Sequence, residues 1–119
     1  MTMPWEGFYS GYMSGVDGQG FALLMFSGGI IVGADPLGVT FDGTYETQED
    51  GSLKGTVQVS VPPHGTVIQG ASAGPAGMQY DVVINFLPNA FAVDFVKLET
   101  PLGPVNIRLV KLRELSAVV

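Results

Sequence analysis

Strict alternation of apolar and polar residues over two neighbouring segments constrains the fold of this chain more than any other feature. In residues 39–46 and again in residues 53–61, every second side chain is apolar or glycine, and the side chains between them are polar. A β-strand places successive side chains on opposite faces, so each segment is predicted to be a strand with one buried face. The pair Asp50-Gly51 readily adopts positive φ, and residues 48–51 are therefore predicted to form a hairpin turn.

Similar patterns run through most of the remaining chain. Further segments are predicted to be strands or parts of strands: residues 5–13, 21–26, 30–32, 79–86, 91–98 and 105–112. The alternation slips at Val110, where we expect a bulge or the end of the last strand. The seventeen glycines and eight prolines leave no window for a long helix, and residues 112–116 are the one helical candidate.

These segments predict an all-β fold in one domain over residues 1–119. Short turns join about eight strands, and we see no helix long enough to cover a flat sheet. A single antiparallel, up-and-down, eight-stranded β-barrel satisfies both observations. The interior of such a barrel is either filled by side chains or holds one small ligand.

The apolar side of the alternation is predicted to point into the barrel. The residues concerned are Phe41, Tyr45, Val57, Val59, Tyr80, Val82, Ile84, Phe95, Ile107 and Leu109. They form either a packed core or the wall of a cavity for a small apolar, fatty-acid-like ligand. Gly43 and Gly55 also fall on this side, where they make a cavity roomier or serve the curvature of the barrel.

Residues 62–77 do not fit the strand pattern. The segment consists mostly of small residues, glycines and prolines. A loop of this length in a compact domain is either functional or disordered. Two interpretations therefore remain open: a lid that folds over one mouth of the barrel, and an excursion without a role.

No motif with catalytic potential has the context that its chemistry requires. Residues 70–74 match G-x-S-x-G around Ser72, but a proline follows the motif where a helix is needed, and the single histidine, His64, precedes it. One histidine and no cysteine provide no usual zinc site. We therefore predict a protein that is not an enzyme and has no catalytic residues, no metal and no cofactor.

Charge is distributed unevenly along the chain. The first fifty residues contain seven acidic side chains and no lysine or arginine, and the net charge is −6. This charge disfavours direct binding to nucleic acid, and it either serves solubility or suits a basic protein partner. The N-terminus lacks the features of a signal peptide and no apolar run is long enough to span a membrane, so a cytoplasmic location is expected.

A series of short motifs lies between residues 6 and 53. The motifs are Glu6-Gly7-Phe8-Tyr9-Ser10, Gly18-Gln19-Gly20, Gly29-Ile30-Ile31-Val32-Gly33-Ala34-Asp35, Phe41-Asp42-Gly43 and the acidic turn at Glu49-Asp50. Their order and spacing resemble the GrlR family, small regulatory proteins of enteric pathogens that repress type III secretion genes. The resemblance implies a lipocalin-like barrel and a homodimer.

In that family, four acidic residues in this turn dock onto a transcriptional activator. The equivalent positions here read Thr47-Gln48-Glu49-Asp50, so Glu49 and Asp50 are the candidate partner-binding residues. Residues 21–26 are apolar on both faces, which favours a partner or a second copy on their outer face. Two functions follow as hypotheses: regulation through protein contacts, and carrying or sensing of a small apolar ligand.

Overall fold

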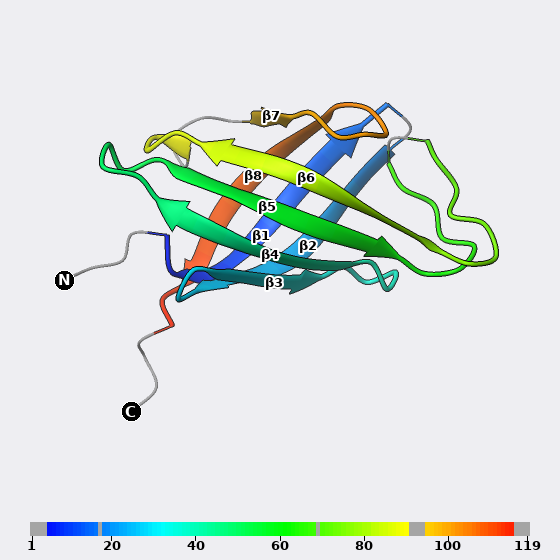
Figure 1. The fold of residues 1–119 in the computed structure, drawn as a ribbon, viewed down its shortest axis with the longest axis horizontal. Helices are drawn as coiled ribbons and strands as arrows, with labels where there is room; N and C mark the ends of the chain where they lie inside the picture. The colour runs from blue at the N-terminus through cyan, green and yellow to red at the C-terminus, as the bar shows by residue number, and fades with distance from the viewer. Residues whose placement is uncertain (1–4, 17, 69, 91–94, 116–119) are drawn as a thin grey trace.

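The fold is an antiparallel sheet that curls almost completely around one axis (Figure 1). A computed structural model of the protein describes residues 5–16, 18–68, 70–90 and 95–115. The strands are β1 (Gly7–Gly15), β2 (Gly18–Ser27), β3 (Ile30–Ala34), β4 (Thr40–Thr47), β5 (Leu53–Val61), β6 (Met78–Phe86), β7 (Val96–Leu98) and β8 (Val105–Arg113). The described residues contain no α-helix.

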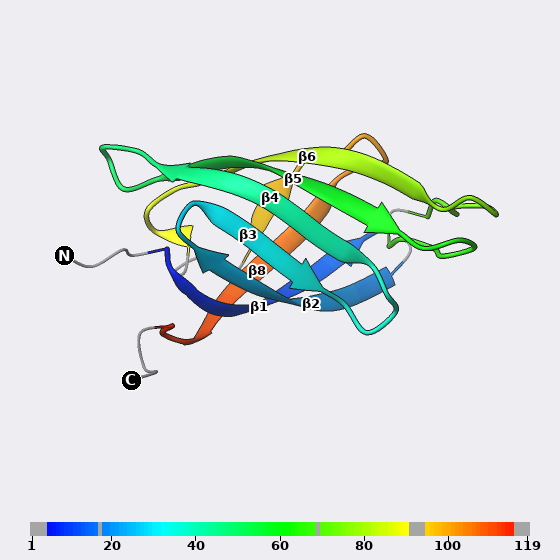
Figure 2. The ribbon, with the colours of Figure 1, turned by 60° about the horizontal axis from the view of Figure 1, so that its bottom comes forward.

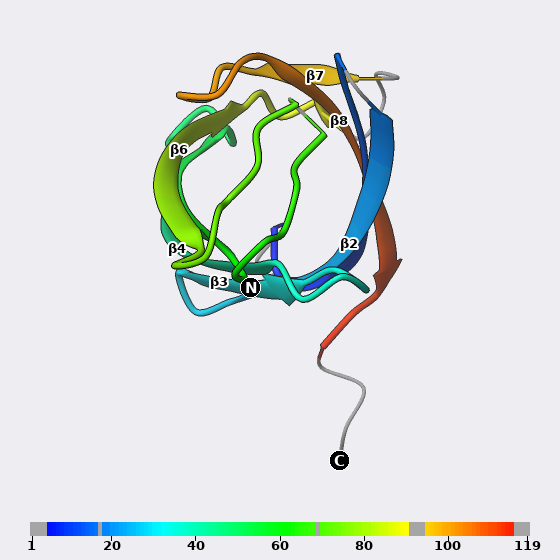
Figure 3. The ribbon, with the colours of Figure 1, turned by 90° about the vertical axis from the view of Figure 1, so that its right-hand side faces the viewer.

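The strand order is that of an up-and-down barrel. The sheet runs β6-β5-β4-β3-β2-β1-β8-β7, so each of the first six strands pairs with its neighbour in sequence, and β8 returns to pair with β1. Among the described residues, no hydrogen-bonded ladder joins β6 to β7. The view along the long axis nevertheless shows a ring of strands (Figure 3), and the turned view shows β3 and β4 continuing the wall (Figure 2). The predicted fold class is confirmed.

The hairpin predicted from residues 39–61 is confirmed. β4 and β5 pair in register, with Tyr45 opposite Gly55 and Phe41 opposite Val59. The turn closes through hydrogen bonds from Gln48 N to Ser52 O (2.7 Å) and from Gly51 N to Gln48 O (3.0 Å). Gly51 has a φ of 88°, which favours glycine at this position.

The C-terminal part of the chain departs from the predictions in three ways. Of residues 91–98, only Val96–Leu98 form a strand, and residues 91–94 lie outside the described part. Residues 112 and 113 extend β8, so the helix predicted from residue 112 is wrong there. The bulge lies beyond Val110, because the pairing with β1 shifts between Lys111 and Arg113.

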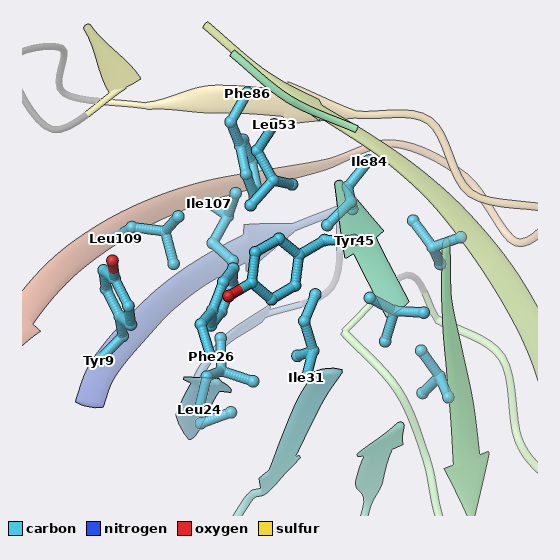
Figure 4. Close-up of a cluster of buried hydrophobic side chains, with 14 of the residues drawn as sticks. Tyr9, Leu24, Phe26, Ile31, Tyr45, Leu53, Ile84, Phe86, Ile107 and Leu109 are labelled. Atoms are coloured by element: carbon cyan, nitrogen blue, oxygen red, sulfur yellow. The ribbon is translucent and has the colours of Figure 1, made fainter. Parts of the chain in front are cut away.

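The buried side chains form one core along the inside of the barrel. Tyr9, Phe26, Ile31 and Leu53 are fully buried, and they come from four different strands. Figure 4 shows aromatic and branched aliphatic side chains from opposite walls pointing toward one another. The packing thus combines side chains that are far apart in the sequence.

Candidate functional site

An apolar cavity of about 130 Å³ remains inside the barrel. Eight residues predicted to point inward line it: Phe41, Val57, Val59, Tyr80, Val82, Ile84, Ile107 and Leu109. Several apolar residues absent from that prediction also line it, including Met13, Leu24, Phe26 and Ile31. The inward-facing residues of β1 and β2 were not predictable, because β1 is rich in glycine, β2 is apolar on both faces, and neither strand alternates cleanly.

Two of the predicted cavity residues lie elsewhere. Tyr45 is buried in the core but does not line the cavity. Phe95 is 57% exposed, so its predicted inward position is wrong. The strand here begins only at Val96, and Val96 and Leu98 are the residues that pack against the core. The predicted inward position of Phe95 is therefore one residue out of phase with the strand that begins at Val96.

An aromatic cluster fills the end of the barrel near the N-terminus. Trp5 is buried, stacks on Phe86 with ring centroids 6.1 Å apart, and donates its indole N–H to Gly51 O at 2.9 Å. Tyr9 donates its hydroxyl to Trp5 O at 2.8 Å. The hydrogen bonds of Trp5 therefore link the beginning of strand β1 to the β4–β5 turn. Its role was missed from the sequence, although it is the only tryptophan in the chain.

Tyr45 extends this aromatic cluster toward the centre of the barrel (Figure 4). Its ring lies 5.4 Å from that of Phe26, which in turn lies 4.8 Å from that of Tyr9. The Tyr45 hydroxyl is buried and makes no hydrogen bond of good geometry. Burial raises the pKa of Tyr45, and the nearby backbone amide of Gly29 offsets part of that rise.

Residues 62–68 and 70–77 cover the opposite end (Figure 3). Val67 and Ile68 line the cavity, whereas His64 and Ser72 are exposed. The segment thus places its two large apolar side chains inward, whereas the two side chains with catalytic potential, His64 and Ser72, lie at the surface. A sequence signal for this existed, since Val67 and Ile68 are the only large apolar residues among residues 62–77.

The polar side chains at this end of the cavity form hydrogen bonds within their own turns. The Asp35 carboxylate accepts hydrogen bonds from Leu37 N (2.8 Å) and Val39 N (3.0 Å). The Thr100 hydroxyl donates to Gly103 O at 2.6 Å. Asp35 is therefore a turn-stabilising residue, and the walls offer mainly dispersion contacts to an occupant.

The acidic turn lies at the end of the barrel that Trp5 closes. Glu49 and Asp50 are both exposed. The Asp50 carboxylate accepts hydrogen bonds from Ser52 N (2.9 Å) and Ser52 Oγ (2.6 Å), and these bonds lower the pKa of Asp50. Asp50 therefore stabilises the turn, whereas the Glu49 side chain is directed to solvent.

The outer face of β1 and β2 carries exposed aromatic and aliphatic side chains. Tyr12 and Phe21 are 51% and 42% exposed and pair across the strands, with ring centroids 6.4 Å apart. Leu23 on the same face is 44% exposed. The sequences of β1, β2 and β3, which are adjacent in the sheet, contain no charged residue. This uncharged outer face of β1–β3 is the second candidate site.

Comparisons with protein-family models, with curated proteins and with solved structures find no match to this chain. Within the described residues, no group of three or more histidine, aspartate or glutamate side chains is placed to hold a metal ion. The same part of the chain has no helix that is long and apolar enough to span a membrane.

Proposed function

We propose that this protein is a non-enzymatic binding protein that holds a small apolar molecule inside its barrel. The observation that carries the proposal is the cavity of about 130 Å³ with largely apolar walls. In another protein, an engineered apolar cavity of about 150 Å³ binds benzene. We therefore propose a ligand of comparable size, a single ring or a short alkyl chain, rather than a long-chain fatty acid.

The proposal is tested by the stability of the folded state in the presence of small apolar probes. A ligand that binds only the folded protein raises the free energy of unfolding by about 2.7 kcal/mol when its concentration is 100 times Kd. We expect benzene, toluene and 1-hexanol to raise the midpoint of urea unfolding. The midpoint is followed by the emission of Trp5, which bonds to Gly51 in the β4–β5 turn. This turn and the segment after β5 lie at opposite ends of the barrel (Figure 1).

Two adjacent valines on β6 provide a matched pair of variants. Val82 lines the cavity, whereas Val83 points outward and is 73% exposed. Val82→Phe is expected to fill the cavity and abolish the probe effect, while Val83→Phe retains it. Val57→Ile, a smaller change at another lining position, serves if Val82→Phe does not fold. The same response in the inward and outward variants, or no response in the wild type, contradicts the proposal.

We propose as a second function that the protein acts through contacts with other proteins, as the resemblance to the GrlR family implies. The uncharged outer face of β1–β3 supports this proposal. Two copies of a chain with a net charge of −6 repel one another at most orientations, and the strands of this face add no charge to that repulsion. The occupant we propose is therefore a second copy of the chain.

Sedimentation velocity over a range of protein concentrations tests the second proposal. A dimer is expected at micromolar concentrations, and a monomer throughout contradicts it. The acidic turn is then available to a basic partner, such as a transcriptional activator. Glu49 is the residue proposed to contact it, because the carboxylate of Asp50 is already bonded to Ser52.

A further inference from the structure

Residues 62–68 and 70–77 form a hairpin that is bonded mainly to itself. The backbone hydrogen bonds of the segment run from His64 N to Gly74 O (2.7 Å), from Ala73 N to Gly65 O (2.7 Å) and from Val67 N to Ala71 O (3.0 Å). Thr66 and Ser72 form an antiparallel bridge between the two arms. These bonds lie within the segment, so the shape of the hairpin does not depend on backbone hydrogen bonds to the strands.

Both arms of this hairpin start from one point of the barrel wall. The segment leaves β5 after Val61 and returns to β6 at Met78, and these two residues are paired. Gly77, directly before β6, has a φ of 73°, and an added Cβ there would lie 2.6 Å from Val61 O. The hairpin is thus attached to the barrel at two paired residues with a glycine beside them, and such a short attachment is suited to a hinge.

The tip of the hairpin rests on the far wall through Ile68. An added Cβ on Gly15 would lie 2.6 Å from Ile68 O and 3.1 Å from Ile68 Cγ1, so only glycine at position 15 accepts the tip at this distance. An added Cβ on Gly20 would lie 3.7 Å from Ile68 Cγ2, an ordinary van der Waals contact. Ile68 therefore contacts the ends of β1 and β2 while its side chain lines the cavity.

We propose that this hairpin is the entrance of the ligand cavity and that Ile68 sets the length of the apolar molecule that the cavity accepts. The inference rests on the proposed binding function and adds a specificity-determining residue to it. Ile68 covers the end of the cavity that lies opposite the aromatic cluster at Trp5. Shortening this side chain lengthens the cavity along the barrel axis without altering its walls.

The substitution Ile68→Ala tests the length limit with a series of alkylbenzenes: benzene, ethylbenzene and butylbenzene. Each buried methylene adds to affinity, so the variant is expected to shift the ratio of Kd values for benzene and butylbenzene about tenfold toward butylbenzene. Val83→Ala is the control, because this exposed side chain on β6 points away from the cavity. Its ratio is expected to equal that of the wild type.

Two glycine variants test the entrance separately. Gly15→Ala displaces the Ile68 backbone from its seat and is expected to increase the dissociation rate of ethylbenzene several-fold, measured by NMR exchange. Gly20→Ala leaves the contact between Ile68 and Gly15 intact and is expected to keep the wild-type dissociation rate. Urea unfolding followed by Trp5 emission verifies that each variant is folded.

The outcomes separate the two proposals. If the wild type binds the probes and Ile68→Ala leaves the length preference unchanged, the role of Ile68 is overturned and the binding function stands. If Gly15→Ala and Gly20→Ala give equal dissociation rates, the entrance is overturned. If no probe binds the wild type or any variant, both proposals are overturned.

Discussion

At the scale of single residues, two buried tyrosines differ in how their hydroxyls are used. Tyr9 donates to Trp5 O, whereas the Tyr45 hydroxyl is buried without a hydrogen bond of good geometry. A buried polar group without a partner is destabilising, and a buried hydrogen bond contributes about 1 kcal/mol. Tyr45→Phe is therefore expected to maintain or raise the free energy of unfolding in urea, while Tyr9→Phe lowers it by about 1 kcal/mol. A larger loss for Tyr45→Phe contradicts this assignment.

The buried hydroxyl of Tyr45 also leads to a prediction of how the free energy of unfolding changes at alkaline pH. Burial raises the pKa of Tyr45 above that of the unfolded chain. Stability is therefore complete below the unfolded value of about 10 and is lost as the pH rises through the folded value. Tyr45→Phe is expected to make part of this alkaline loss disappear. Urea unfolding between neutral and alkaline pH measures it, with Tyr12→Phe, which removes a half-exposed hydroxyl, as the control.

The two residues of the acidic turn are expected to behave differently in acid. Hydrogen bonds from Ser52 lower the pKa of Asp50, so its stabilising contribution is present above the unfolded pKa and is lost as the pH falls through the folded value. Asp50→Asn is expected to lower the free energy of unfolding at neutral pH and to converge with the wild type in acid. Glu49→Gln is the matched control, and an equal effect of both variants argues against a structural role for Asp50.

At the scale of elements, the hairpin β4–β5 depends on two glycines that face the interior. An added Cβ on Gly43 would collide with Thr56 O, and one on Gly55 would collide with Thr44 O. These glycines let the two backbones approach closely, which favours curvature over the alternative of cavity volume. Gly55→Ala is expected to cost about 2 kcal/mol or more in urea unfolding. Gly18→Ala, where an added Cβ meets nothing within 4 Å, is expected to be nearly neutral.

Elements with a regular pattern and a distinct turn were predictable from the sequence. Residues 39–61 have both, and they form β4, the turn and β5 as expected. The strand near residue 95 was not predictable in phase, because it forms only three residues and pairs only with β8. The position of residues 62–77 was also beyond the pattern, since it depends on contacts of Ile68 with Gly15 and Gly20 in distant strands. The part of the cavity wall that comes from β4, β5, β6 and β8 was thus predictable, whereas the part from β1 and β2 and the closure of the cavity were not.

At the scale of the whole molecule, the two ends of the barrel are closed in different ways. Near the N-terminus, buried aromatic rings are fixed by the bonds of Trp5 and Tyr9. At the other end, a hairpin bonded mainly to itself rests on glycine. Local opening occurs most readily where few contacts hold a segment to the rest of the fold. The asymmetry therefore favours local opening at the end covered by residues 62–68 and 70–77, away from the acidic turn.

The outer face of β1–β3 leads to a prediction about self-association. Leu23→Lys places a charge in the middle of this uncharged face and is expected to shift the sedimentation of the protein toward the monomer. Val83→Lys places the same charge on an exposed position of β6 and is expected to leave association unchanged. Equal behaviour of the two variants rules out this face as the interface.

Salt distinguishes an apolar interface from one held by ion pairs. Each copy carries a net charge of −6, and added salt screens the repulsion between copies. Because the strands of the proposed interface contain no charged residue, screening removes repulsion without weakening any attraction. Dimerisation is therefore expected to strengthen between about 50 mM and about 500 mM NaCl, roughly half and roughly five times the 0.1 M at which the screening length is about 10 Å. An interface built on ion pairs gives the opposite trend, and weaker association at high salt would place the contact elsewhere on the barrel.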